Sequence, residues 1–592
     1  MTPSKGILQL LRNLWCHINL RRRRQFIILI FLIVLASFAE IISIGAVIPF
    51  LAVLTAPDKL FDHAAAQTFI HMLGYTEPGQ LLLPLTITFG VAAIMAGVMR
   101  LLMLWIVTRL SYATGADISM SIYRRTLYQP YKVHVGRNSS EVISGIVSKA
   151  NLTISSIIMP ILTLISSFVM LSLIMVALFS FDPFIASIVF GGFGLVYILI
   201  IWITRSQLLK DSQRVAYEST QVVKSLQEGL GGIRDVLIDG SQDAYCQIYR
   251  KADRALRRAQ GNNAFIGQSP RYIMEALGML LIAILAYTLA QHADGIAKAI
   301  PILGALALGA QRLLPVLQQA YAAWSSIQGG RISLQDTLEL LNQELPDYAA
   351  QSVNKPLPFK HEISLNQLSF RYSLETAWVL KNINLSISKG SRVGFMGTTG
   401  SGKSTLLDIV MGLLRPNEGT FEIDGQIITM ENHRAWQMHI AHVPQDIFLA
   451  DGSIEENIAF GVPKDQINHE RVRNSACQAQ IDSIIDTLPK QYQTLVGERG
   501  VRLSGGQRQR IGIARALYKK ADIIIFDEAT SALDTETEKA VMHAIENLNE
   551  NLTILIIAHR ITTLKNCTQI VELGDGVIKR TGTYREIVNN LV

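Results

Sequence analysis

The sequence of 592 residues contains few charged residues and few cysteines. Asp, Glu, Lys and Arg together make up 17% of the chain, whereas hydrophobic residues make up 49%, which is unusual for a soluble enzyme of this length. The four cysteines, Cys16, Cys246, Cys477 and Cys567, show no paired spacing, so neither a disulfide framework nor a metal site built from cysteines is expected. The length predicts two or more domains.

Long apolar runs dominate the first half of the chain. Six of them reach about 20 residues or more, the length at which a helix crosses about 30 Å of hydrocarbon. The expected spans are Gln25–Thr55, Leu81–Val107, Thr153–Ser180, Pro183–Thr204, Tyr272–Ala290 and Ala297–Ile327. Helical periodicity in the long polar segments after spans two and four predicts that these helices continue into water and turn back.

Basic residues are distributed unevenly between the two sides of these spans. Arg21–Arg24 precede span one, and the long segments after spans two and four are rich in Lys and Arg, whereas Lys59 is the only such residue in the segment 56–80. This asymmetry predicts that both termini are cytoplasmic. It also accounts for the net charge of +7, so no nucleic-acid partner is expected. We expect the outer loop 56–80 to cap the outer end, with contact to a substrate as the alternative.

The pattern changes after Ile327. A proline-containing, weakly periodic stretch indicates a linker, and short β-rich runs then alternate with helical ones, as expected for an α/β domain around a mainly parallel sheet. The expected domains are an all-α membrane domain over residues 1–330, a linker over 331–360 and an α/β P-loop domain over 361–592.

The stretch GTTGSGKS follows a predicted strand and precedes a predicted helix, which is the context that a phosphate-binding loop requires. Glycines allow backbone N–H groups to converge on phosphate oxygens, and the helix N-terminus adds a positive dipole end. Lys403 is expected to contact the β and γ phosphates of ATP, and Ser404 to ligate Mg²⁺. The candidate nucleotide-binding residues here are Gly397, Thr398, Thr399, Gly400, Ser401, Gly402, Lys403, Ser404 and Thr405.

The segment IIIFDE supplies a second part of the site. Its apolar residues predict a buried strand that ends at Asp527, where a carboxylate can hold Mg²⁺. Glu528 follows directly, and its carboxylate is placed to polarise an attacking water.

Between these two motifs lies LSGGQ, residues 503–507, which resembles the signature sequence of ATP-binding cassette transporters. Six spans followed by one such cassette is similar to the layout of an exporter half-transporter, so the resemblance covers the whole chain. It implies that Tyr372 stacks on adenine and that Gln445 joins Mg²⁺ to the membrane domain. His559 is implied to contact the γ-phosphate and Asp534 the dimer interface.

The resemblance also implies that Glu498 meets the turns of the membrane domain. LSGGQ begins a predicted helix and therefore offers a second anion site, formed by Ser504, Gly505, Gly506 and Gln507. Because the chain already has its own phosphate loop, this site is expected to close on ATP bound by another subunit. A homodimer, or a very similar partner chain, is therefore predicted.

Arginines inside the expected spans bear on the cargo. A charge near the bilayer centre costs at least about 2.5 kcal/mol, so it normally faces a polar cavity. Arg312, Arg100 and Arg271 are the candidates for a cavity that accepts an anion. Snorkelling or interface anchoring, and pairing with Glu40 and Glu275, remain alternatives.

Short stretches in spans one, five and six resemble bacterial flippases of lipid-linked oligosaccharides. The resemblance implies ATP-driven translocation of an amphiphilic, polyprenyl-pyrophosphate-linked glycan across the bacterial cytoplasmic membrane. Export of another lipid, a peptide or a drug is the first alternative. A membrane-anchored regulatory ATPase or an ATP-gated channel is the alternative of another class.

Overall fold

The computed structural model describes residues 6–46, 50, 53, 78–181, 183–290, 295–350, 355–528, 535–546, 552–558 and 561–589. The chain divides into two compact units. One comprises Met1–Gln129 and Arg137–Leu345, and the other comprises Pro130–Gly136 and Pro346–Val592.

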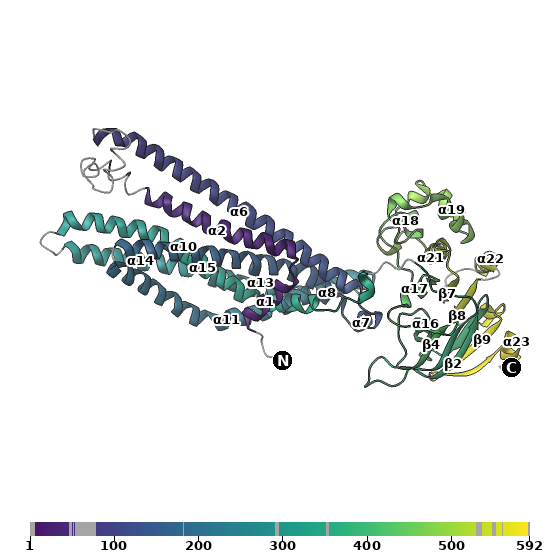
Figure 1. Ribbon diagram of the computed structural model, residues 1–592. Coiled ribbons are helices and arrows are strands. Elements are labelled where there is room, and N and C mark those ends of the chain that lie inside the picture. The colour runs from purple at the N-terminus through teal and green to yellow at the C-terminus, as the bar shows by residue number, and fades with distance from the viewer. Residues whose placement is uncertain are drawn as a thin grey trace. The chain divides into compact units, whose positions relative to one another are not determined.

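The N-terminal unit is helical throughout its described part (Figure 1). Its elements are α1 (Ile7–His17), α2 (Leu20–Gly45), η1 (Pro78–Leu81), α6 (Leu82–Leu127), α8 (Ser139–Ser144), η2 (Gly145–Lys149), α9 (Ala150–Thr153), η3 (Ile154–Ile158), α10 (Met159–Phe181), α11 (Pro183–Gly231), α12 (Ile233–Ile238), α13 (Gln242–Gln268), α14 (Pro270–Ala290) and α15 (Gly295–Leu341).

Four helical stretches in the described part are long and apolar enough to cross a membrane. They are Leu20–Ser43, Leu82–Leu127, Ser139–Val176 and Phe190–Gly231. The other two expected spans fall on α14 and α15, where many side chains lie outside the described residues. Most of the expected outer loop, residues 54–77, also lies outside them.

Several helices extend well beyond the apolar spans. α6 has 46 residues and α11 has 49, so each is roughly 70 Å long at about 1.5 Å per residue. This confirms that helices continue past spans two and four. α15 likewise runs to Leu341, so the expected domain end at residue 330 falls inside this helix, and the compact unit itself ends at Leu345.

The packing of the N-terminal unit includes an apolar cluster and a partly buried ion pair. Leu29 and Ile33 of α2 pack with Ile157 of η3 in the same core cluster. Lys149 lies at the end of η2, a π-type turn, and its ammonium contacts the carboxylate of Asp336 on α15 with Nζ–Oδ2 2.5 Å. The two π-helical turns η2 and η3 both contact α15, where the segment from α8 to α10 packs on that helix.

The C-terminal unit combines two sheets with flanking helices (Figure 1). Its strands are β1 (Glu362–Phe370), β2 (Leu380–Ser388), β3 (Arg392–Gly397), β4 (Glu418–Ile423), β5 (Gln426–Ile427), β6 (Ile440–Val443), β7 (Ile523–Asp527), β8 (Thr553–Ile557), β9 (Gln569–Gly574) and β10 (Val577–Gly582).

Its helices are α7 (Tyr131–Val135), η4 (Asp347–Ala350), α16 (Lys403–Val410), α17 (His433–Gln437), α18 (Ile454–Ile458), η5 (Lys464–Gln466), α19 (His469–Gln478), α20 (Asp482–Thr487), η6 (Gln491–Gln493), η7 (Glu498–Gly500), α21 (Gly505–Lys519), α22 (Thr535–Glu546), η8 (Ile561–Leu564) and α23 (Tyr584–Asn589).

The larger sheet has the order β10-β9-β3-β8-β7-β6, and the smaller antiparallel sheet has the order β2-β1-β4-β5. In the larger sheet, β9, β3, β8, β7 and β6 pair in parallel, and only the edge strand β10 is antiparallel. Every residue of β8 is buried, as expected for a central strand covered on both faces. The expected α/β domain with a mainly parallel sheet is therefore confirmed.

Candidate nucleotide site

The candidate residues gather at one edge of the larger sheet. Parallel strands end at the same edge, so the segments that follow β3, β6 and β7 emerge side by side. These segments carry the phosphate loop, Gln445 and the pair Asp527 and Glu528, respectively. β8, which leads toward His559, lies between β3 and β7, but His559 itself falls outside the described residues.

The glycines of the phosphate loop are required by its backbone geometry. Gly397, Gly400 and Gly402 have φ of 146°, 84° and 98°, which only glycine adopts without strain. A Cβ on Gly397 would lie 2.1 Å from the carbonyl oxygen of Leu573, and a Cβ on Gly402 would lie 2.7 Å from Cδ2 of Leu380. At Gly400, by contrast, nothing lies within 4 Å, so the loop stays open at this point.

Lys403 begins α16, and its side chain turns back over this loop. Its ammonium donates to the carbonyl oxygens of Gly397 and Thr398, each at 2.9 Å. Burial lowers the pKa of Lys403, and the nearby carboxylates of Glu528 and Asp527 oppose that shift. An ammonium carries three donors, so one remains for a phosphate oxygen.

Tyr372 follows β1 and lies next to the phosphate-loop helix. Its hydroxyl lies 3.3 Å from Oγ1 of Thr405, and its ring packs edge-on against Phe370 at 5.0 Å between centroids. These contacts fix an aromatic ring beside α16. The geometry is suited to stacking on a base whose phosphates lie in the loop.

The acidic end of β7 is held by its neighbours. The side-chain amide of Gln445 donates to the carboxylate of Glu528, with Nε2–Oε2 2.9 Å. Glu528 has φ 51°, a left-handed conformation that is uncommon for a residue with a side chain and that clusters at functional sites. Its backbone N–H donates to the carbonyl oxygen of Ile557 at 3.1 Å, which ties it to the end of β8.

These residues fit a nucleoside triphosphate with Mg²⁺. The phosphate loop is open at Gly400, and the Lys403 ammonium lies against the same loop with one of its three N–H donors unused. Ser404 follows Lys403 on α16, and its side chain is exposed. Asp527 ends β7, which is separated from β3 in the sheet by β8 alone. A hydroxyl and a carboxylate are the oxygen ligands that Mg²⁺ prefers.

The LSGGQ segment forms a capped helix start. Ser504 is the N-cap of α21, and its hydroxyl accepts from the backbone N–H of Gln507 at 3.2 Å. The side chain of Gln507 in turn accepts from the backbone N–H of Ser504 at 2.9 Å. Gly505 and Gly506 form the first turn. This reciprocal bonding is a capping box, a role for Gln507 that its S-x-x-Q spacing could have revealed.

The remaining predicted residues are distributed as follows. Glu498 begins η7, shortly before α21, and Asp534 lies outside the described residues. No contact that the structure shows in its described part brings Glu498 to the phosphate loop.

Each of the two membrane arginines whose side chains are described lies next to a glutamate. Arg100 on α6 faces Glu40 on α2 with Nη1–Oε1 3.6 Å, and Arg271 on α14 contacts Glu275 one turn further with Nε–Oε1 2.7 Å. The backbone of Arg312 lies in α15, but its side chain lies outside the described residues. The charge pairing left open by the sequence is therefore present at both described arginines.

Comparison with known proteins agrees with this geometry. The family profile for ABC transporters matches residues 380–531, and the profile for the ABC transporter transmembrane region matches residues 26–295. The chain is 30% identical over 402 residues to an ATP-dependent lipid A-core flippase of Alkalilimnicola ehrlichii, covering 67% of each chain.

Two further matches bear on the range of the family. The chain is 39% identical over 283 residues to the leukotoxin export ATP-binding protein LtxB of Aggregatibacter actinomycetemcomitans, covering 48% of this chain and 39% of that protein. The solved structure of a bacterial Atm1-family ABC exporter with ATP bound matches with a TM-score of 0.78 and 23% identity over 96% of each chain, which establishes the fold. The chain therefore belongs to the ABC transporter family, as an exporter-type protein that couples ATP hydrolysis to transport across a membrane.

Proposed function

We propose that the protein flips an anionic, lipid-linked oligosaccharide or polysaccharide precursor across the bacterial cytoplasmic membrane, with both termini in the cytoplasm. The observation that carries this proposal is that Arg100, within an apolar span, is exposed and only loosely paired with Glu40. Its side chain is 55% exposed, and its contact with Glu40 at 3.6 Å is longer than a hydrogen bond. The guanidinium therefore retains donors for a phosphate group, whose planar bidentate contact suits arginine.

Arg271 has a different part in this proposal. Its bond to Glu275 lies along one helix and is short, so we assign it first to anchoring the start of α14. Arg312, in the middle of span six, is proposed as a further cation of the cargo cavity. A phosphate-bearing head then meets positive charge while its hydrophobic tail stays in lipid.

The energy would come from ATP, whose γ-phosphoryl group is transferred to water, and Mg²⁺ would neutralise charge on the phosphate oxygens. Lys403 and the loop N–H groups would hold the phosphates, Ser404 and Asp527 would hold the metal, and Tyr372 would stack on the base. Glu528 orients and polarises the attacking water, and Gln445 holds the Glu528 carboxylate in position. Asp534 and His559 keep the dimer-contact and γ-phosphate roles that the motif implies.

The partner is proposed to be a second copy of this chain. The capped N-terminus of α21 presents Ser504 and Gly506 as an anion site, while the phosphate loop of the same chain already has its own set of donors. Two copies then enclose two ATP molecules, each between one phosphate loop and one LSGGQ segment. Closure on ATP and release after hydrolysis switch the membrane helices between two arrangements.

A liposome assay tests the cargo. The purified protein is reconstituted with fluorescent lipid-linked oligosaccharide, and the fraction accessible from each side is followed after addition of ATP. ATP-dependent movement is expected. Absence of movement, together with strong stimulation of ATP hydrolysis by another amphiphile, would exclude the glycan cargo.

Export of another lipid or of a polypeptide is the alternative within the family. The names of the relatives support it, since one is a flippase for lipid A-core and another an exporter of leukotoxin. The same liposomes, loaded with each amphiphile in turn, distinguish these cargoes by which of them moves and raises the rate of ATP hydrolysis.

A regulatory ATPase or an ATP-gated channel is the alternative of another class. A passive pore would continue to move substrate when ATP is bound but not hydrolysed. Continued movement in the Glu528→Gln variant would favour that alternative over a pump.

A further inference from the structure

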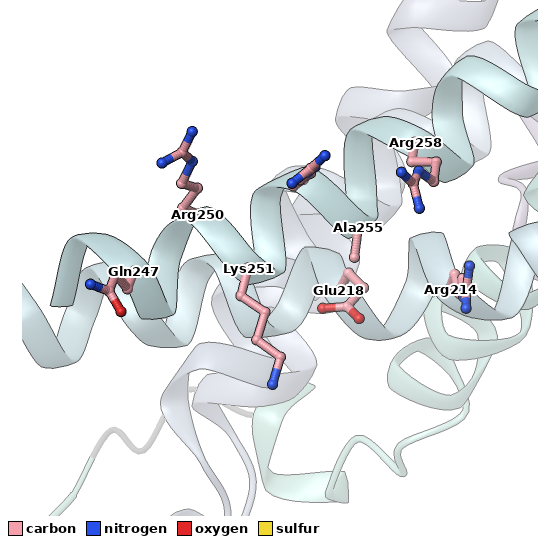
Figure 2. A pocket seen from close by; sticks show the side chains of 8 residues that line it. Arg214, Glu218, Gln247, Arg250, Lys251, Ala255 and Arg258 are labelled. Atoms are coloured by element: carbon pink, nitrogen blue, oxygen red, sulfur yellow. The ribbon is translucent and has the colours of Figure 1, made fainter. Parts of the chain in front are cut away.

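A second concentration of charge lies far from the phosphate loop in sequence, on α11 and α13. Five cationic side chains and one carboxylate line an open hollow of about 720 Å³ between these helices (Figure 2). The lining residues are Arg214 and Glu218 of α11, and Gln247, Arg250, Lys251, Arg254, Ala255 and Arg258 of α13. No assigned step of the transport cycle uses them.

The packing of the two helices explains why a hollow forms here. Val215, Leu256 and Ala259 are buried and form the apolar contact between α11 and α13. Above this contact, Ala255 has a side chain too short to fill the space. Figure 2 shows Arg258 extending from α13 toward α11, where Arg214 lies on the same hollow.

The arginines of α13 are spaced so that their charges accumulate on one face. Arg250, Arg254 and Arg258 recur every four residues, and like charges at this spacing destabilise a helix by a few tenths of a kcal/mol per pair. Arg257, on an adjacent face, is instead neutralised by Asp253 with Nε–Oδ1 3.2 Å. Within the described residues, Arg254 and Arg258 form no ion pair and donate no side-chain hydrogen bond, and the same holds for Arg214.

The general excess of cytoplasmic cations applies within about 15 to 20 residues of a span, a range that includes Arg254 and Arg258. It does not specify that these side chains line one hollow together with Arg214 of another helix. Arg258 precedes Pro270, where α14 begins, by about 18 Å along a helix at about 1.5 Å per residue. The polar zone of a bilayer extends only about 5 to 8 Å beyond its hydrocarbon, so Arg258 lies beyond this zone if the helix runs along the bilayer normal from a boundary at Pro270.

We propose that this hollow is a diphosphate-binding site. Guanidinium groups from both helices line it, with Arg214 from α11 and the other arginines from α13. A planar guanidinium matches phosphate oxygens in a way that a lysine ammonium does not. Its volume lies within the range of about 300 to 1,000 Å³ typical of small-molecule sites and exceeds the needs of one phosphate. Glu218 lines the same space, and its carboxylate can accept a hydrogen bond from a hydroxyl or ammonium group of the ligand, which favours a phosphorylated organic molecule over inorganic phosphate.

The diphosphate has two possible sources, a soluble molecule and the head of a lipid. The distance of the hollow from the start of α14 favours the soluble source. A large lipid-linked head group reaches it only if it extends well away from the bilayer surface. The site does not depend on the identity of the transported cargo, so a failed flipping assay leaves this proposal open to its own test.

The test measures binding to the full-length protein in nanodiscs. The nucleotide sites are first saturated with a non-hydrolysable ATP analogue, so that the phosphate loops do not bind the probe. Pyrophosphate is then titrated by calorimetry into the wild-type protein, the double variant Arg254→Gln/Arg258→Gln, and the matched control Arg257→Gln. A parallel series uses phosphatidylcholine nanodiscs with and without undecaprenyl diphosphate.

Salt-sensitive pyrophosphate binding that weakens about tenfold or more in the double variant, but not in the control, supports a soluble ligand. Binding seen only with undecaprenyl diphosphate, and lost in the same variant, supports a lipid head group. No binding of either probe, or equal binding by the double variant and the control, overturns the proposal. Unchanged thermal unfolding of each variant excludes a folding defect as the cause of lost binding, and weaker binding by Arg254→Lys/Arg258→Lys than by the wild-type protein tests the requirement for guanidinium geometry.

Discussion

The side-chain amide of Gln445 and the carboxylate of Glu528 form a direct hydrogen bond of 2.9 Å at the ends of two adjacent parallel strands. Gln445 lies in the loop after β6, and Glu528 follows β7 in a left-handed backbone conformation. The loop therefore holds the carboxylate in position. Any movement of this loop changes the orientation of Glu528.

Replacing Gln445 by Ala is expected to reduce the rate of ATP hydrolysis by about tenfold, because the Glu528 carboxylate loses one hydrogen bond that orients it. ATP affinity is expected to change little, since the phosphate loop is untouched. Steady-state hydrolysis and equilibrium binding of a fluorescent ATP analogue measure the two effects separately. A large loss of affinity at an unchanged maximal rate would contradict the positioning role.

Replacing Glu528 by Gln is expected to stop hydrolysis almost completely, by a factor of about 100 or more, while ATP still binds. The amide keeps the size of the side chain but is not a base. Trapped ATP is also expected to hold two copies together, which size-exclusion chromatography with light scattering detects.

The substitution Glu431→Gln serves as a control for Glu528→Gln, because it alters an exposed carboxylate in the segment between β5 and α17, which carries none of the proposed nucleotide-binding residues. Its rate of hydrolysis should match that of the wild-type protein. A Glu528→Gln variant that stays monomeric with ATP bound would contradict closure of two cassettes on nucleotide.

Two capping boxes in the same unit allow helix stability and catalysis to be separated. Ser504 pairs with Gln507 at the start of α21, and Ser453 pairs with Glu456 at the start of α18. Each Ser→Ala substitution is expected to lower the free energy of unfolding by about 1 kcal/mol. Only Ser504→Ala should also reduce ATP hydrolysis, because only its helix start faces nucleotide in the proposed dimer.

Differential scanning fluorimetry and hydrolysis assays on both variants measure this contrast. Equal loss of activity in Ser453→Ala and Ser504→Ala would mean that activity follows stability alone. The anion-site role of the LSGGQ segment would then be unsupported.

Local patterns in the sequence predicted much of the nucleotide site. The glycine spacing of the phosphate loop and the apolar strand before Asp527 are both patterns of residues that are close in sequence, so they can be recognised without the structure. Parallel pairing of the strands then brings these two segments to one edge of the larger sheet. The hydrogen bond between Gln445 and Glu528 joins residues 83 positions apart, which no local pattern specifies. Pairing of Arg100 with Glu40 likewise depends on how α2 and α6 pack.

The domain boundary shows the same limit. Residues 331–341 continue α15, and the next proline after Pro315 is Pro346, so the helix is not interrupted near the expected boundary. The segment Pro130–Gly136, which contains α7, groups with the C-terminal unit although it lies between membrane helices in sequence. Its tertiary contacts, rather than its composition, determine that grouping.

Asp408 of α16 is expected to make stability depend on pH. Burial raises its pKa to about 6, and the carboxylate of Asp527 contributes in the same direction. The folded protein therefore binds more protons than the unfolded chain between about pH 4 and pH 6, so stability falls as the pH rises through this window. Asp408→Asn should remove this slope and raise stability above pH 6 by on the order of 1 kcal/mol, allowing for partial exposure.

Asp424 provides a control with the opposite sign. Burial raises the pKa of Asp424, but backbone N–H donors from Glu362, Lys360 and His361 outweigh that effect and bring it below the usual value. Asp424→Asn should therefore lose stability near neutral pH and less at acidic pH. Thermal unfolding midpoints at several pH values between 4 and 8 compare the two variants, and parallel pH profiles would contradict the opposite assignments.

The cargo proposal makes different predictions for the two partners of the membrane ion pair. If Arg100 receives a phosphate group, Arg100→Gln should slow flipping of lipid-linked oligosaccharide by about tenfold, because charge-assisted hydrogen bonds to the cargo are lost. Glu40→Gln should preserve flipping, since it removes only a carboxylate that competes with the anionic head for the same guanidinium. Basal ATP hydrolysis in both variants should stay close to that of the wild-type protein. If instead both single variants flip equally slowly and the exchange Arg100→Glu/Glu40→Arg restores the wild-type rate, the pair serves to join α2 to α6, and the anionic head must be bound by other residues.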